Sequence, residues 1–248
     1  MKKYKSIFIS DIHLGSKGCQ ADVLCDFLKH NVSENLFLVG DIIDGWRLKR
    51  KYYWPQSHTN VVRRILTAAK RDTKVTYVAG NHDEVLRSLI PYNINFGNIN
   101  VVNQYNYKAL NGKTYMVLHG DLFDTALLSK LTWLYHLGDM VYNILFDINI
   151  LVNKIRSFFG MPYWSLSAYV KNKTKEALAF IGEFENLIVD YCTKRNVDGI
   201  ICGHIHTPNI KIIKGKECMN DGDWVENCSA LVENYDGSWE IVFWKKRK

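Results

Sequence analysis

Side chains that commonly bind metal ions recur at five places in this sequence, each directly after a short apolar run. Five of the eight histidines fall in these places, together with carboxylates and one amide. Imidazole, carboxylate and amide ligands suit hard or borderline divalent cations, and no thiolate belongs to the set. The five motifs are Asp11-Ile12-His13, Gly40-Asp41-Ile42-Ile43-Asp44, Gly80-Asn81-His82-Asp83-Glu84, His119-Gly120-Asp121 and Gly203-His204-Ile205-His206.

The size of this set predicts a centre for two ions. Seven ligands are too many for one tetrahedral ion, but they fit two ions if one carboxylate bridges them. Two ions about 3.5–4 Å apart can clamp the attacking and leaving oxygens of an in-line displacement, and they lower the pKa of bound water to near neutrality. A single Asp-x-His would fit a structural role equally well. Together, the five motifs indicate hydrolysis of a phosphoester or phosphoanhydride.

Three histidines lie outside the pattern. We expect ordinary surface or core roles for His30 and His136. His58 follows the Trp54-Pro55 turn close to the second motif, so it is a further candidate for reaching the site.

The elements that must position these groups read as strands alternating with helices. Short apolar runs at residues 6–10, 35–40, 75–80, 114–119 and 199–203 have the length of buried strands. Helical patterns at 21–30 and 59–71 place Val23, Leu24, Phe27 and Leu28, and then Val61, Val62, Ile65, Leu66 and Ala69, on one face each. Residues 210–213, 229–233 and 239–244 read as consecutive strands with a hairpin signal at Asp236-Gly237. This order predicts an α/β layered sandwich of two mixed β-sheets flanked by helices.

Residues 122–192 interrupt that order. They are apolar nearly all round at helical spacing, with sparse charges and a break at Pro162. We interpret them as a helical insertion, a cap over the strand ends within a single domain of residues 1–248. Exposed aliphatic and aromatic side chains there, including Phe158-Phe159 and Tyr163-Trp164, would form an apolar slot for acyl chains. Packing of the cap onto the core, or a dimer interface, would account for the same residues.

Composition and net charge indicate where the protein acts and what kind of partner it binds. The chain has 248 residues and a formal charge of +7, part of it in the basic cluster from Arg47 to Lys51 and in the last four residues. Basic clusters suit anionic partners or a solvated surface. The six cysteines form no Cys-x-x-Cys pair, and the apolar run at 7–9 is too short for a signal peptide. These features predict a cytoplasmic protein with peripheral contact to the inner membrane leaflet.

The order and spacing of the five motifs resemble the calcineurin-like metallophosphoesterase superfamily along essentially the whole chain. The resemblance implies that Asp11, His13, Asp41 and His206 hold one metal, and that Asn81, His119 and His204 hold the other with Asp41 as the bridge. It also implies that His82 is the general acid or transition-state stabiliser beside the phosphate, oriented by Asp44. The expected cofactors are two divalent ions, with Mn²⁺ first and Fe²⁺, Zn²⁺ or Co²⁺ as alternatives.

A narrower resemblance concerns the substrate. Phe8-Ile9-Ser10-Asp11-Ile12-His13-Leu14-Gly15, Asp44-Gly45-Trp46 and Gly222-Asp223-Trp224 look like the UDP-2,3-diacylglucosamine pyrophosphatase branch. That branch implies hydrolysis of the pyrophosphate bond of UDP-2,3-diacylglucosamine by a metal-bridging hydroxide, giving UMP and 2,3-diacylglucosamine 1-phosphate in lipid A biosynthesis. Substrate contacts would then come from Asn81, His82, Asn172 and Lys175. Where this chain has His82, the branch carries Arg.

Other readings stay open at this point. A phosphodiesterase or phosphatase acting on a soluble nucleotide or phosphoprotein would use the same metal centre. A nuclease is disfavoured, because no aromatic platform interleaved with Lys or Arg would track a nucleic-acid strand. A non-catalytic scaffold of the same fold predicts missing ligands, and none is missing here.

Overall fold

The computed structural model describes residues 1–92, 95–123, 152–161 and 186–244. The chain divides into two compact units, one of Met1–Asp121 with Val189–Lys248 and one of Leu122–Ile188. Both β-sheets belong to the first unit. In the second unit residues 152–158 are helical. Most of the expected insertion at 122–192 lies outside the described residues, so its role as a cap stays a prediction.

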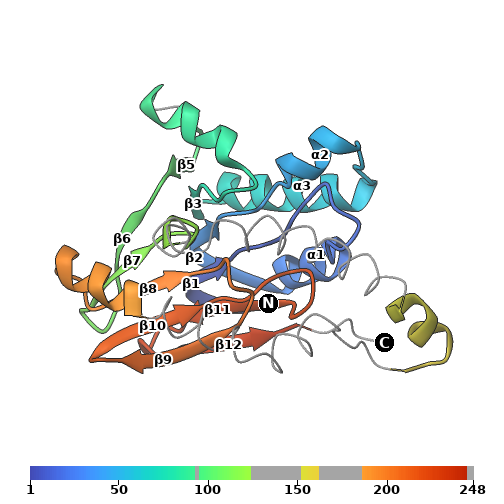
Figure 1. Ribbon diagram of the computed structural model, residues 1–248. Helices are drawn as coiled ribbons and strands as arrows, with labels where there is room; N and C mark the ends of the chain where they lie inside the picture. The colour runs from blue at the N-terminus through green and yellow to red at the C-terminus, as the bar shows by residue number, and fades with distance from the viewer. Residues whose placement is uncertain (93–94, 124–151, 162–185, 245–248) are drawn as a thin grey trace. The chain divides into compact units, whose positions relative to one another are not determined.

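The larger sheet has seven strands in the order β12-β11-β1-β2-β3-β5-β4 (Figure 1). Its centre is parallel, because β1 pairs with β2, β2 with β3 and β3 with β5 in the same direction. The flanking strands β11, β12 and β4 pair antiparallel with their neighbours. The bounds are β1 Lys2–Ile9, β2 Asn31–Val39, β3 Lys74–Val78, β4 Asn95–Phe96, β5 Ile99–Val102, β11 Ser229–Glu233 and β12 Trp239–Phe243.

The smaller sheet has five strands in the order β6-β7-β8-β10-β9. Strands β7, β8 and β10 are parallel, and β6 and β9 close the two edges antiparallel. The bounds are β6 Tyr105–Lys108, β7 Thr114–Val117, β8 Gly199–Cys202, β9 Asn209–Ile213 and β10 Lys216–Asn220.

Helices α1 (Ala21–His30) and α3 (Gln56–Lys70) pack on one face of the seven-stranded sheet. A short helix α2 (Gly45–Arg50) and a 3-10 helix η1 (Glu84–Tyr92) follow β2 and β3. The five-stranded sheet covers the opposite face, where Phe8, Phe37 and Leu231 meet Val117, Ile201 and Met219.

Successive residues of the central strands therefore face two different apolar layers. In β1, Ile7 and Ile9 pack toward the helices, whereas Phe8 packs between the sheets and stacks on Phe37 with ring centroids 4.5 Å apart. Burial on both sides explains why these strands read as continuous apolar runs rather than as alternating patterns. The predicted layered sandwich of two mixed sheets flanked by helices is confirmed.

The sequence patterns missed several elements. Strands β5, β6 and β10 and the helix α2 were not predicted. Leu66, expected on the buried face of α3, is half exposed because that face is narrower than its pattern indicated and consists of His58, Val61, Ile65 and Ala69.

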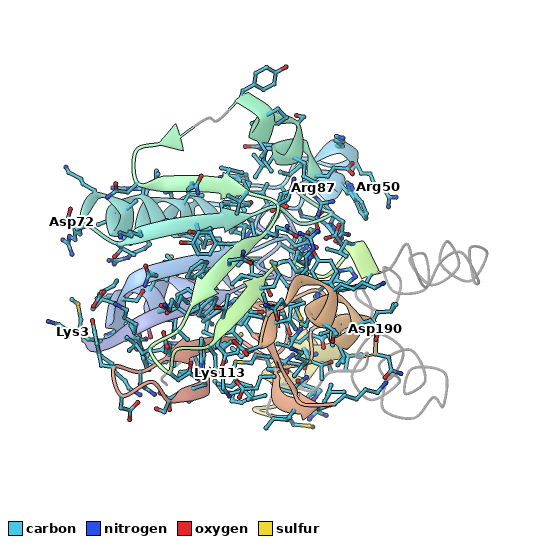
Figure 2. All side chains as sticks on the ribbon, turned by 90° about the vertical axis from the view of Figure 1, so that its left-hand side faces the viewer. Lys3, Arg50, Asp72, Arg87, Lys113 and Asp190 are labelled. Carbon is cyan, nitrogen blue, oxygen red and sulfur yellow. The ribbon has the colours of Figure 1, made fainter. Side chains whose placement is uncertain are left out.

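The carboxyl ends of the parallel strands mark the position of the site. Figure 2 shows Arg50 and Arg87 at one end of the layers, and Lys3 and Asp72 at the other. Lys3 lies near the start of β1, and Asp72 shortly precedes β3. The segments that follow β1, β2 and β3 therefore emerge on the side of Arg50 and Arg87.

Candidate metal centre

The segments after five strands bring the predicted ligands together. Asp11 and His13 follow β1, Asp41 follows β2, Asn81 follows β3, His119 follows β7, and His204 and His206 follow β8. Ligands thus come from both sheets. Three sets of three residues each bring their donor atoms within 4.8 Å of one another. These sets are Asp11-His13-His206, His13-Asp41-His82 and Asp11-Asp41-His119.

The first half of the cluster centres on Asp11. Its Oδ1 lies 3.1 Å from His206 Nε2 and 3.9 Å from His13 Nε2. The other ring nitrogen of His13, Nδ1, lies 3.4 Å from Asp44 Oδ2, so the Nε2 edge faces the carboxylates. A carboxylate on one nitrogen fixes the tautomer that leaves the other nitrogen available to a metal ion.

The second half centres on His119. Its Nδ1 donates a hydrogen bond to the carbonyl oxygen of Val39 at 2.8 Å, which turns Nε2 toward the cluster. That Nε2 lies 3.2 Å from Asn81 Oδ1 and 3.3 Å from Asp41 Oδ2. The rings of His119 and His204 are 5.1 Å apart.

Asp41 lies between the two halves. The same Oδ2 that faces His119 lies 4.0 Å from His13 Nε2, and it is buried. Its other oxygen, Oδ1, accepts a hydrogen bond from the backbone amide of His82 at 2.8 Å. This is the position that a bridging carboxylate requires.

The backbone at these positions is unusual. Asp11, His13, Asp41, His204 and His206 all have positive φ, between 48° and 67°. For a non-glycine residue the left-handed region is disfavoured by roughly 1–2 kcal/mol, and such strain gathers at functional sites. Gly40, with φ of 82°, also leaves room for the His119 ring, because a Cβ there would overlap it.

The residues fit a pair of divalent ions. Asp11 Oδ1 is fully buried and no well-aligned hydrogen bond reaches it, although His206 Nε2 lies 3.1 Å away, so this oxygen remains available to a ligand other than a protein donor. Burial opposes ionisation of Asp11 and Asp41, yet the charges of His206 beside the first and His119 beside the second hold both pKa values well below the usual range. Burial alone would lower the pKa of His119, but Asp41 raises it well above the usual value. The cluster therefore favours positive charge at its centre.

His82 lies beside this cluster and is held by Asp44. Its Nδ1 donates to Asp44 Oδ1 at 3.0 Å, its Nε2 lies 3.9 Å from Asp41 Oδ2, and its ring lies 4.3 Å from that of Trp46. Burial lowers the pKa of His82, but the hydrogen bond to Asp44 and the charges of Asp41, Asp44 and Asp11 together outweigh it, and the net shift is upward. A protonated imidazole beside the ligands is the arrangement that a proton donor needs.

Supporting residues that sequence reasoning did not assign lie behind the ligands. Asp83 accepts hydrogen bonds from the amides of Gly80 and Ile42, at 2.6 and 2.9 Å, and so joins the segments after β3 and β2. The Ser10 hydroxyl lies within hydrogen-bonding distance of both Asp11 Oδ2 and the buried Asp221 Oδ1. Asp83 stands inside the third motif and Asp221 directly precedes Gly222, but neither position distinguishes a supporting carboxylate from an ordinary polar residue.

Three expectations fall outside the cluster. Asn172 and Lys175, expected to contact substrate, lie outside the described residues. His58 is buried on α3 and is in none of the three sets, and its Nδ1 accepts a hydrogen bond from the amide of Gly15.

A family model described as calcineurin-like phosphoesterase matches residues 4–208. The chain belongs to this family. As a calcineurin-like phosphoesterase it is a metal-dependent hydrolase of phosphoesters, and the expectation drawn from the five motifs is confirmed at that level.

The chain is also similar to individual proteins. The chain is 24% identical over 246 residues to a UDP-2,3-diacylglucosamine hydrolase of Vibrio atlanticus (strain LGP32), covering 92% of this chain and 93% of that protein. Among solved structures it is similar to Yfce, a phosphoesterase from E. coli, with a TM-score of 0.45 and 16% identity over 97% of this chain and 99% of that chain. It is also similar to an archaeal phosphodiesterase, with a TM-score of 0.44 and 10% identity over 96% of this chain and 98% of that chain.

Within the part of the chain that the structure describes, no helix is both long and apolar enough to cross a membrane.

Proposed function

We propose that this phosphoesterase hydrolyses the pyrophosphate bond of UDP-2,3-diacylglucosamine, giving UMP and 2,3-diacylglucosamine 1-phosphate for lipid A synthesis. The observation that carries the substrate is the match to the Vibrio atlanticus hydrolase, which extends over 92% of this chain and 93% of that protein. A match of this extent runs through the unit Leu122–Ile188 as well as through the part of the chain that carries both sheets.

Different residues of the chain would bind the metal ions and donate the proton. Asp11, His13, Asp41 and His206 would hold one ion, and Asn81, His119 and His204 the other, with Asp41 shared. Bound divalent ions supply Lewis-acid activation of water and of the phosphate oxygens, and Mn²⁺ is the expected metal. His82, whose hydrogen bond to Asp44 raises its pKa, would donate a proton to the leaving phosphate oxygen and would contact the substrate together with Asn81.

The exposed surface near the site suits an anionic lipid substrate. On α2 and the residues that follow it, Lys49, Arg50 and Lys51 are exposed, and the ring of Tyr52 is 77% exposed. Basic and amphipathic aromatic side chains together are typical of protein surfaces that contact a lipid headgroup layer. In the unit Leu122–Ile188, Phe158 is 86% exposed, as an apolar contact with acyl chains would require.

The decisive experiment compares three substrates on full-length protein loaded with Mn²⁺. These are UDP-2,3-diacylglucosamine in detergent micelles, its deacylated analogue, and bis(p-nitrophenyl) phosphate. We expect UMP and the acylated sugar phosphate, identified by mass spectrometry, from the first at far higher kcat/KM, because each buried methylene contributes about 0.8 kcal/mol to binding. Equal kcat/KM on the acylated and deacylated sugar nucleotides would instead favour the soluble-substrate phosphoesterase.

The cap has its own test. Charged substitutions at Leu131 or Trp133, in the predicted cap, should raise KM for the acylated substrate with little effect on the aryl phosphodiester. Equal losses on both substrates would mean that these residues pack the protein together and do not receive acyl chains.

Contact with the membrane is tested separately, by sedimentation with vesicles. We expect binding to vesicles that contain anionic lipid, and a lower bound fraction for the double variant Lys49→Ala/Arg50→Ala. The charge-matched control is the double variant Lys70→Ala/Arg71→Ala, at two exposed residues beside Asp72 at the opposite end of the layers. Binding that ignored lipid charge would contradict the proposed surface.

A further inference from the structure

His58 touches the segment that carries the first two predicted ligands, although it is not itself one of the clustered groups. It lies on the buried face of α3 together with Val61, Ile65 and Ala69. Its Nδ1 accepts a hydrogen bond from the backbone amide of Gly15 at 3.0 Å, in the buried interior. Gly15 is two residues beyond His13.

Most of the other backbone bonds of the segment from Asp11 to Ser16 go to the segment after β2, while the Trp224 amide donates to Asp11 and the Ser16 amide to His13. The amide of His13 donates to the carbonyl of Asp41, and that of Leu14 to Ile42, both at 2.9 Å. At Gly15 the chain turns with φ of 106°, and a Cβ there would come within 2.7 Å of Leu48 on α2. The amide of Leu14 is the last in this segment that donates to the segment after β2, and the next amide, that of Gly15, donates to the His58 imidazole instead.

The orientation of the imidazole is itself fixed. The rings of Tyr53 and Trp54 meet it edge to face, with centroids 5.7 and 5.5 Å away. The indole nitrogen of Trp54 donates to Thr59 Oγ1 at 3.1 Å, which anchors Trp54 to the start of α3. Burial lowers the pKa of His58, opposed only by the charge of Asp22, so the ring is neutral and can keep an unprotonated Nδ1.

We propose that His58 is a positioning residue for the metal ion that His13 binds, acting through the Gly15 amide. A buried amide without an acceptor is costly, so loss of this acceptor would let residues 13–16 rearrange to satisfy it. His13 has a left-handed backbone, with φ of 53°, that persists only while its surroundings enforce it. Release at Gly15 would therefore move the imidazole of His13 away from Asp11 and Asp41.

This role rests on the proposed metal centre but not on the proposed substrate. It depends on one acceptor atom and not on the bulk of the side chain, so it differs from the packing role of Val61 on the same face. Asparagine can place its Oδ1 near the position of Nδ1, whereas leucine fills similar space without an acceptor.

The test titrates chelator-treated, full-length protein with Mn²⁺ and follows each binding step by electron paramagnetic resonance. His58→Leu should bind one of the two ions about 10- to 100-fold more weakly, the loss that follows removal of a group supporting a ligand. His58→Asn should stay within a few-fold of wild type. Val61→Ala is the matched control for a disturbed α3 and should bind both ions as wild type does. Equal weakening in the Leu and Asn variants, or none in the Leu variant, would overturn the proposal.

A second measurement needs no variant and no metal. The long-range ¹H–¹⁵N spectrum of the metal-free wild-type protein distinguishes the two ring nitrogens of His58. We expect an unprotonated Nδ1 and a protonated Nε2, and the reverse assignment would overturn the contact. Fewer than two ions on the wild-type protein would instead contradict the metal centre of the proposed function.

Discussion

Asp41 is the residue on which the two halves of the cluster depend. Its Oδ2 lies 3.3 Å from His119 Nε2 and 4.0 Å from His13 Nε2, so its removal affects both halves at once. Asp41→Ala should weaken the binding of both ions, by about 100-fold or more for a direct ligand, and activity should fall with metal content. Metal content by mass spectrometry against phosphodiesterase rate checks this. Asp26→Ala, at a half-exposed carboxylate on α1, is the control, and an Asp41 variant that retained two ions would refute the bridging role.

His82 is predicted to act on the substrate rather than on the metals. His82→Ala should keep both ions and lose about 10²- to 10⁴-fold in turnover, the range for a positioned proton donor. The loss should be larger for a substrate with a poor leaving group than for a p-nitrophenyl ester, whose leaving group needs no proton. Rates on both substrates measure the difference, with His30→Ala as the matched histidine control. Loss of a metal ion from the His82 variant would make it a ligand.

At the scale of elements, Gly40 allows the segment after β2 to approach the segment after β7, which carries His119. Gly40 combines φ of 82° with a Cβ direction that points into the His119 ring, whereas Gly112, with φ of 83°, has open space around it. Gly40→Ala should therefore destabilise the fold by more than Gly112→Ala, by about 1–3 kcal/mol for the overlap alone. It should also weaken metal binding, which Gly112→Ala should not. Urea unfolding of both variants provides the comparison, and equal losses would show that only the backbone angle matters.

Much of this arrangement could be predicted from sequence, because strand and ligand follow one another directly. A strand buried on both faces reads as a run of apolar residues, and the polar residue that ends it stands at the sheet edge. This is why Asp11, Asp41 and His119 could be assigned. Strand β10 could not, because Lys216–Asn220 contains a lysine, a glutamate and an asparagine within five residues. Its place is set by pairing with β8 and β9, which no local pattern encodes.

The supporting contacts were harder to predict than the ligands. His58 bonds to Gly15 across 43 residues, and Asp83 bonds to Ile42 across 41. Such contacts depend on how α3 and the segment after β3 dock, and composition near either residue carries no sign of it. Proximity in sequence pointed to His58 as a site candidate, but only the fold distinguishes contact with a ligand-bearing segment from contact with a metal.

At the scale of the whole molecule, the ions would join the two sheets. Asp11, His13, Asp41 and Asn81 follow strands of the seven-stranded sheet, and His119, His204 and His206 follow strands of the five-stranded sheet. Metal at about 100 times its dissociation constant adds about 2.7 kcal/mol per site to the free energy of unfolding. Thermal unfolding with Mn²⁺ and with a chelator should therefore differ by several degrees in wild type. The same comparison on Asp41→Ala should show a much smaller difference, and an equal one would place the stabilising ions elsewhere.

The N-terminal strand β1 lies inside the larger sheet, so one of its two neighbours is synthesised only near the end of the chain. Strand β1 pairs with β2 on one side and with β11, more than 220 residues away, on the other. His204 and His206 are likewise remote in sequence from Asp11. Contacts of such separation form late, because closing long loops has an entropic cost.

Metal binding should therefore slow unfolding and leave the refolding rate nearly unchanged, since the ions act on interactions absent from the transition state. Stopped-flow kinetics in Mn²⁺ and in chelator measure both rates, and faster refolding with Mn²⁺ would indicate that the metal centre assembles early. On the ribosome, a chain that has not yet reached residue 206 holds Asp11 and His13 without His206, so we expect the ion of the first half of the cluster to be captured late in maturation.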